Sequence, residues 1–443
     1  MDSTLLINGL NCTQSNHPQA SAERLAPRLR LPDRMQMRWE AWSLDERLAA
    51  DHPARTIWAV VERLDLSMFY AAIEAREGTV GRDATDPRIL VALWLYAAVE
   101  GVGQGRRLAR LCEVHDAYRW LCGGVSVNYH TLNDFRVQHE RALDDLLTQV
   151  LATLMHEGLV DVKRISQDGT KVRASAGRQS FRRRSRLEQM HAEAKAHLES
   201  LKAQSEDEPA LSAQQRAGRE RAVRERQEKI EKALEQMAEL EAAKAEEQER
   251  KRRKTISPAR VSTTDPEARV MKMPNGGFDP AYNAQIATDP HSRAIVAVRV
   301  INHGTDHGED APLRQQVERR TGQKVQEHLL DGGYVKRENI DAAAEAGAAI
   351  FAPLPATSKD QKPCLKNPND SPAVAAWRAR MQTAEGQQAY KQRASTSETV
   401  NGDLKTYRGL GPFQVRGLDK VQCVALWSAL AYNILHFAEV LLA

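Results

Sequence analysis

The chain has 443 residues, enough for two or three domains with their own cores, and its 42% hydrophobic and 28% charged residues are typical of a globular protein. No stretch reaches the roughly 18 apolar residues of a membrane span, and Met1–Ala20 lacks the basic leader and apolar run of a signal peptide. These features exclude a membrane-spanning protein and predict a cytoplasmic one. The formal net charge of +4 is small, so nucleic-acid contacts would have to come from local clusters.

The first part of the chain divides into a polar leader and a helical domain. Residues 1–31 are too rich in Asn, Ser, Gln and Pro to support a core. Residues 32–160 repeat apolar side chains at helical spacing, with a break at Gly101–Gly105, a helix over Arg106–Val114 and a further helix that ends near Arg136. Asn128 or Thr131 can cap that last helix. Short helices joined by glycine turns suit a helix-turn-helix-like unit that presents Asn128 and Arg136 to DNA, although a bundle used only for packing or dimerisation fits too.

A strand and a charged helical segment follow. Val162–Ala174 has strand character. Residues 186–255 are rich in Glu, Lys, Arg, Ala and Gln, with sparse apolar residues mostly three or four apart, and Pro209 divides the segment. This pattern predicts an inserted helical hairpin that packs as a coiled coil; it can serve as a spacer or as a clamp on DNA or a partner. The basic residues before it, Arg182, Arg183 and Arg184, can neutralise phosphates or can simply face solvent.

The C-terminal part alternates strands and helices. Tyr282–Thr288 and Arg293–Ile301 alternate like paired strands around a turn. Helices predicted over Pro312–Gly322 and Arg337–Ala346 are then interleaved with strands over Glu327–Leu330 and Ala349–Ala352. A last apolar helix over Gln422–Leu442 would cover the sheet with Leu426, Leu430, Ile434 and Phe437. The pattern by itself predicts a mixed α/β domain.

Three acidic residues are the candidates for chemistry. Asp168 lies in a strand-like segment, Asp331 follows another, and Glu398 opens a helix-like one. Three carboxylates on such elements could hold two Mg²⁺ ions, since hard oxygen ligands suit Mg²⁺ and Mn²⁺ can replace it, and a metal pair suits phosphodiester chemistry. Each acid also has a structural alternative. Both aspartates precede glycine as turn residues do, and Ser395 with Glu398 has the spacing of a capping box. Other acids, including Asp306, lie on predicted loops.

Glu398 belongs to a spaced motif, Tyr390-x2-Arg393-x4-Glu398-x6-Lys405. Lys405 follows Glu398 by about two helical turns, so both share a face and Lys405 could hold a DNA phosphate. Arg393 stands about 140° away around a helix. Either a helix begins anew near Ser395 or Arg393 points elsewhere, which predicts a role in packing for Arg393.

From these residues, and from Gly81–Pro87, Tyr118–His130 and Ser262–Met271, the chain resembles the bacterial insertion-sequence transposases of the DDE type, in the superfamily with the tyrosine, arginine, glutamate and lysine motif. The likeness extends from about Arg28 to the C-terminus. The commonest spacing in that superfamily has three residues between arginine and glutamate, whereas this chain has four.

The resemblance implies an RNase H-like catalytic domain over residues 161–185 and 256–443, with the hairpin inserted and the helical domain in front. It also implies metal-dependent cleavage at the ends of the element and strand transfer into target DNA, with Asp168, Asp331 and Glu398 as metal ligands. Tyr390, Arg393 and Lys405 would contact DNA, Asp265–Arg269 would form a DNA-contacting loop, and the protein would act as a nucleoid-associated homodimer on double-stranded DNA. Two alternatives stay open: a nuclease without strand transfer, and an inactive DNA-binding descendant.

Overall fold

The computed structural model describes residues 41–75, 83–204, 213–251, 257–355 and 367–443. By its contacts the chain divides into Met1–Trp42 and Ser43–Ala443. The predicted polar leader, residues 1–31, lies outside the described residues. The elements described below belong to the second unit. None of the described helices is both long and apolar enough to cross a membrane.

The N-terminal part of this unit is helical, as predicted. Its described helices are α1 (Pro53–Arg63), α2 (Ser67–Ala71), α3 (Pro87–Val99), α4 (Gly105–Val114), α5 (Asp116–Cys122), α6 (Tyr129–Gln138) and α7 (Glu140–His156). α3 stops just before Gly101, whose φ of 64° lies in the left-handed region. The Asn128 side chain caps α6 by accepting the amide hydrogen of Thr131. The expected break and cap are therefore confirmed.

A six-stranded mixed sheet follows the helical region. Its path runs β4 (Arg269–Lys272), β5 (Phe278–Thr288), β1 (Arg164–Arg173), β7 (Glu327–Leu329), β8 (Ala349–Phe351), and β6 (Ile295–Ile301) also pairs with β5. β5 is antiparallel to β1 and β6, whereas β7 is parallel to β1 and to β8. The fold is thus mixed α/β with a helical N-terminal region. The predicted β5–β6 pairing is confirmed, with the turn closed by Arg293 at a φ of 66°.

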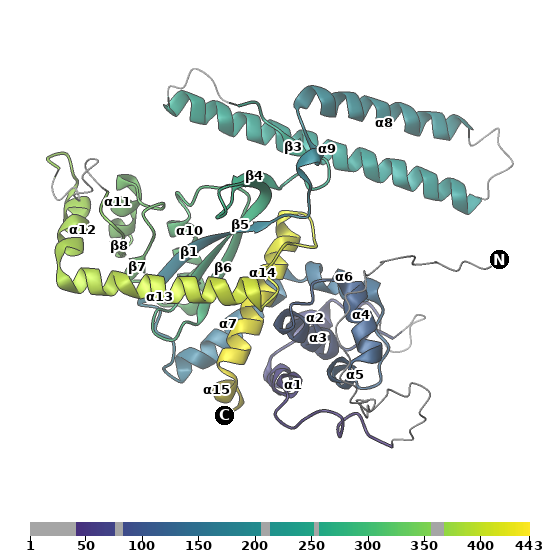
Figure 1. Cartoon of the computed structure of the whole chain (residues 1–443), viewed down its shortest axis with the longest axis horizontal. Coiled ribbons are helices and arrows are strands. Elements are labelled where there is room, and N and C mark those ends of the chain that lie inside the picture. The colour runs from purple at the N-terminus through teal and green to yellow at the C-terminus, as the bar shows by residue number, and fades with distance from the viewer. Residues whose placement is uncertain (1–40, 76–82, 205–212, 252–256, 356–366) are drawn as a thin grey trace, which may run out of the picture. The chain divides into compact units, whose positions relative to one another are not determined.

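Helices connect and cover the parallel strands. α10 (Asp310–Thr321) precedes β7 and ends at the left-handed Gly322. α11 (Arg337–Glu345) precedes β8, and α12 (Pro372–Gln382) packs with β7 and β8 in a small cluster that contains Leu329 and Trp377. α13 (Ala384–Thr406) then runs across the sheet, where it contacts β1 and β5 (Figure 1).

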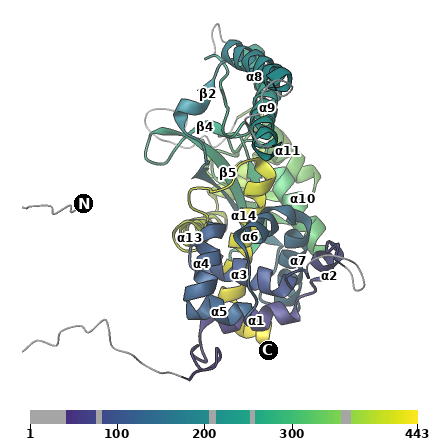
Figure 2. The same ribbon diagram turned by 90° about the vertical axis from the view of Figure 1, so that its right-hand side faces the viewer.

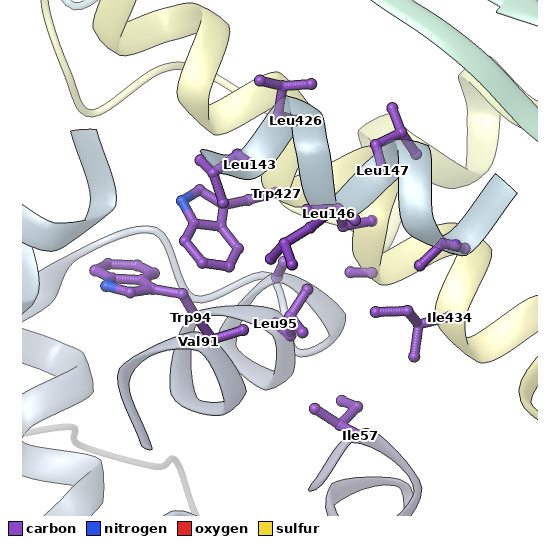
Figure 3. Packing of buried hydrophobic residues seen from close by; sticks show 14 of the residues in the cluster. Ile57, Val91, Trp94, Leu95, Leu143, Leu146, Leu147, Leu426, Trp427 and Ile434 are labelled. Carbon is purple, nitrogen blue, oxygen red and sulfur yellow. The ribbon is translucent and has the colours of Figure 1, made fainter. Parts of the chain in front are cut away.

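The C-terminal apolar segment forms two helices, α14 (Leu418–His436) and α15 (Ala438–Leu442), where one was predicted. The residues expected to cover the sheet belong to a core that joins the helical region to Ile165, Ala287 and Ala297 of the sheet. They are Leu426, Leu430, Ile434 and Phe437. Figure 3 shows Leu426, Trp427 and Ile434 among side chains of α1, α3 and α7. The opposite face of α14, including Val421 and Tyr432, covers β5 and β6. α14 is apolar on all sides because it lies between two layers.

Two long helices occupy the predicted insertion. α8 (Arg184–Gln204) and α9 (Ala213–Lys251) lie side by side in both views (Figures 1 and 2). Leu187, Ala233 and Met237 are buried between them, and His191 Nε2 lies 3.0 Å from Glu231 Oε1. A two-stranded ribbon of β2 (Phe181–Arg182) and β3 (Val261–Ser262) joins the start of this hairpin to the chain that leaves it.

The expectation of a DNA-contacting loop over Asp265–Arg269 is wrong for its first residue. The Asp265 carboxylate is buried and accepts hydrogen bonds from the Tyr282 hydroxyl at 2.8 Å and the Gly417 amide at 3.2 Å. Glu267 accepts the Leu418 amide at 2.8 Å. Both acids therefore hold the N-terminus of α14, where negative charge is favourable.

Candidate active site

The register of two parallel strands brings Asp168 and Asp331 together. Ser166 of β1 is paired with Leu329 of β7, and each aspartate stands two residues beyond its strand's member of that pair. The two residues therefore lie at the same level of adjacent strands, typically about 5 Å apart, with Asp168 inside β1 and Asp331 just beyond the end of β7. Asp168 is partly buried, whereas Asp331 is exposed and accepts the Gly332 amide at 2.6 Å.

Side chains from α13 hold both oxygens of Asp168. Arg393 Nη2 donates to Oδ1 at 2.8 Å, and Asn401 Nδ2 donates to Oδ2 at 2.9 Å. Burial raises the pKa of Asp168 above its usual value; the Arg393 guanidinium opposes that shift, and the Asp331 charge adds to it. The carboxylate is thus positioned by two donors and repelled by its neighbour.

Three interpretations of the last motif are corrected by the course of α13. The helix is continuous from Ala384 to Thr406, so Glu398 lies in its interior and does not open it. Ser395 is no cap, since its hydroxyl donates to the Gln392 carbonyl one turn back. Arg393 forms an ion pair with Asp168, so it points into the site even though four residues separate it from Glu398.

A stripe along α13 explains this geometry. Arg393, Ser397 and Asn401 are spaced four apart and drift only about 80° around the helix. All three contact β1. Arg393 and Asn401 bind Asp168, and the Ser397 hydroxyl lies 2.8 Å from the Ser166 hydroxyl. Glu398 is one residue past Ser397 and is exposed. Within the described ranges, no group of three or more His, Cys, Asp or Glu side chains is arranged to hold a metal ion.

The other two motif residues also lie near the acids. Tyr390 is half-buried, which raises its pKa, and it senses the charges of Arg393, Asp331 and Asp168. Burial lowers the pKa of Lys405, and the Asp168 charge opposes that shift. Tyr390 and Lys405 therefore lie close enough to Asp168 for its charge to influence their pKa values, while Arg393 contacts it directly.

Sequence reasoning missed two side chains near Asp168. Asn401 lies eight residues beyond Arg393 in the motif, and this helical spacing was the signal that could have found it. Asp306 was set aside as a loop residue, but its Oδ1 accepts hydrogen bonds from Asn283 at 2.7 Å and Gln285 at 2.8 Å, and its charge raises the pKa of Asp168. A Cβ on Gly169 would overlap Asp306, so this acid lies on the face of β1 opposite Asp168.

The predicted DNA-contacting residues outside the motif have varied surroundings. Arg184 pairs with Glu241 of α9 at 2.6 Å, Arg182 donates to the Gln179 and Phe181 carbonyls, and Arg183 is exposed. Asn128 caps α6. Arg136 is buried, against the expectation that α6 presents it at the surface: its guanidinium stacks on Trp94, 4.7 Å from the ring centroid.

Two family models match the chain. A transposase domain model matches residues 42–138, and a transposase DDE domain model matches residues 356–438. The chain is an insertion-sequence transposase of the DDE type. The first match falls on the helical region and the second contains all of α13 and α14. No curated protein and no solved structure matches this transposase.

Proposed function

We propose that this transposase cuts DNA at the ends of its own element and joins the freed 3′-hydroxyls to target DNA, with Asp168, Asp331 and Glu398 as its catalytic acids. The observation that carries the proposal is the placement of Asp168 and Asp331 at the same level of adjacent parallel strands, next to the helix that bears Glu398. The resemblance of the motif and the DDE family match support the same three residues.

The catalytic domain is proposed to be RNase H-like, over residues 161–185 and 256–443. The strand order supports this, since three antiparallel strands, β6, β5 and β1, are followed by β7 and β8 parallel to β1. The hairpin over residues 186–255 enters after β1 and returns before β5, so it leaves that order intact.

The donor set fits a hard divalent cation. Asp168 and Asp331 offer carboxylate oxygens and repel each other, and Asp331 is exposed while Asp168 is partly buried. Mg²⁺ favours such ligands while keeping bound waters, and Mn²⁺ can substitute. Two Mg²⁺ ions would activate the attacking oxygen and stabilise the leaving one. Glu398 is exposed one residue past Ser397, and we propose that its side chain turns towards the two aspartates when metal and DNA bind.

The surrounding side chains would orient the acids and the DNA. Arg393 and Asn401 fix the Asp168 carboxylate from two directions, so its oxygens keep one orientation. Lys405, on the same side of α13 as Glu398, is proposed to hold a DNA phosphate, and Tyr390 to contact the strand beside Asp331. Arg182 and Arg183 at the base of the hairpin would add phosphate contacts. The helical domain, residues 32–160, is proposed to bind the element ends, and a homodimer would bring both ends together.

The experiment is cleavage of a supercoiled plasmid that carries the DNA flanking the gene, with Mg²⁺ or Mn²⁺. Asp168→Asn, Asp331→Asn and Glu398→Gln should each abolish cutting and leave end binding nearly intact, because charge is removed and shape is kept. Glu385→Gln, an exposed acid on the same helix, is the matched control and should cut normally.

Strong residual cutting by any of the three variants would remove that residue from the site. Cutting without joined products would assign a nuclease. End binding by the wild-type protein with no cutting under either metal would assign an inactive DNA-binding protein.

A further inference from the structure

A pocket with a volume of about 280 Å³ lies where the helical region meets the end of α13. Its lining includes Gly103, Gln104, Arg107, Arg136, Lys405 and Phe413. Three of the lining side chains are cationic and none is a carboxylate. The lining thus combines positive charge from two regions far apart in the sequence.

Arg136 is the unusual member of this lining. Only 8% of the residue is exposed, its Nη1 donates to the Gly103 carbonyl, and its guanidinium plane rests on Trp94. Burial lowers its pKa to about 10, and among the described residues no carboxylate forms an ion pair with it. A buried guanidinium without a counter-charge is costly and accepts an anion readily, above all one with several oxygens.

The first turn of α4 adds to the same preference. Gln104 and Arg107 belong to this turn and line the pocket, and the Gln104 side chain makes no capping hydrogen bond. The first N–H groups of a helix have no partner within the helix, and they favour negative charge.

A larger pocket elsewhere differs from this one because carboxylates are part of its lining. That cavity, of about 760 Å³, lies between α7, α10 and α14. It is lined by acids as well as bases, and its Arg320 already pairs with Asp144. Charges of both signs cancel there, so nothing in it selects an anion.

We propose that the pocket formed by Arg107, Arg136, Lys405 and the start of α4 binds a phosphate group, and that this phosphate belongs to the DNA backbone next to the reacting strand. The second half rests on the proposed function. Lys405 lies one helical turn, about 6 Å of rise, beyond Asn401, which contacts Asp168. A phosphate in the pocket would therefore tie the helical region and the acids to one strand.

The first test needs neither DNA nor cleavage. Melting of the full chain is compared in inorganic phosphate and in sodium chloride at equal ionic strength. The wild-type melting temperature should be higher in phosphate. Arg107→Gln should lose most of that difference, because the exposed Arg107 lines the pocket, whereas Arg110→Gln, one turn further along α4 and outside the lining, should keep it. No phosphate-specific rise, or an equal rise in Arg107→Gln, would overturn the site.

Arg136→Met provides an independent variant, because it removes the guanidinium that rests on Trp94 and leaves an unbranched apolar side chain in its place. The folded variant should show no rise in phosphate, and Arg136→Lys should recover part of it. A full rise in folded Arg136→Met would equally overturn the site. If Arg136→Met does not fold, Arg107→Gln still decides the question.

The second test identifies the source of the phosphate. Duplexes spanning an element end are neutralised at one phosphate at a time by a methylphosphonate. One position near the cut should weaken wild-type binding about tenfold, the size of a lost charge-assisted hydrogen bond. The same substitution should cost nothing further in Arg107→Gln. Independent effects at every position, together with a pocket-dependent phosphate rise, would assign the pocket to a free phosphate compound and overturn the DNA half.

Discussion

Helices α13 and α14 both lie against the central sheet, but α14 buries mainly apolar side chains, whereas α13 buries a mixture of polar and apolar ones. α14 buries Val421, Leu426, Trp427 and Ile434 between two layers, so nearly all of its surface is apolar and covered. Besides Val400 and Leu404, α13 buries three polar side chains and leaves Glu398 exposed. The buried polar residues are Thr396, Ser397 and Asn401, and the last two contact β1. Apolar burial stabilises a fold, whereas buried polar groups contribute little beyond repaying their desolvation. From this comparison we expect α14 to contribute mainly to the stability of the fold and α13 mainly to the candidate site.

The largest effect should follow from truncating α14. Trp427→Ala removes a fully buried indole whose Nε1 donates to the Arg136 carbonyl, and should lower the free energy of unfolding by about 3–5 kcal/mol. Urea denaturation measures the change. Lys420→Ala, exposed on the same helix, is the control and should stay within about 0.5 kcal/mol of wild type. An equal decrease in the free energy of unfolding in both variants would contradict the conclusion that the covered face of α14 stabilises the fold.

A pH series tests the sheet between the two helices. His328 of β7 is fully buried, and burial together with Arg314 lowers its pKa to about 3. The folded state disfavours the imidazolium, so this histidine's contribution to stability is complete above its ordinary pKa near 6.5. It should be lost progressively as the pH falls from 6.5 towards 3, by roughly a few kcal/mol. Denaturation of His328→Gln over this range should show a shallower loss; an identical pH profile would contradict the assignment.

Substitutions on the polar face of α13 should lower cleavage activity more than they lower the free energy of unfolding. Arg393→Gln removes the ion pair with Asp168 and should lower cleavage by about 10–100-fold, the usual effect of losing a residue that orients a metal ligand. The spacing argument from sequence predicts that this variant keeps measurable cleavage and acts through packing; the ion pair reverses that expectation. Lys391→Gln, exposed two residues earlier, is the control. Normal cleavage per folded Arg393→Gln molecule would restore the packing role.

The smallest effect is expected in the hairpin. Arg183 is exposed, whereas Arg184 pairs with Glu241 across α8 and α9. Arg183→Gln should reduce the slope of log affinity against log salt by about 0.9, the value for one phosphate contact. Arg184→Gln should leave the slope unchanged. DNA binding over a salt series separates them, and equal slopes for wild type and Arg183→Gln would return Arg183 to a solvated surface.

Local signals made much of the fold predictable. Alternation and turn residues located β5, β6 and β7 to within a few residues, and Asn128 located the start of α6. The division of α14 between two cores was not predictable, because a helix that is apolar all round gives no face to choose. The break at Phe437 left no glycine or proline signal.

The sequence predicted which residues form the candidate site better than it predicted how they are arranged. The sequence motif identified Arg393 and Glu398 as site residues. Their angular separation around the helix does not reveal which face of α13 packs on β1, and it is the face that carries Arg393. Ser395 to Ser397 resemble a helix start, yet Thr396 and Ser397 are buried against neighbouring structure and the helix continues through them. Tertiary contact overrode the local preference of these residues for caps.

The central claim is that three remote acids share one divalent-metal site, and the most direct measurement is metal-directed cleavage of the protein backbone. Fe²⁺ replaces Mg²⁺, ascorbate and peroxide generate hydroxyl radicals at the bound metal, and mass spectrometry locates the cuts. If the three acids share one site, cuts should appear near Asp168, Asp331 and Glu398 together, and excess Mg²⁺ or the Asp168→Asn substitution should suppress all of them. Cuts near Asp168 and Asp331 with none near Glu398, in the presence of bound element-end DNA, would contradict it.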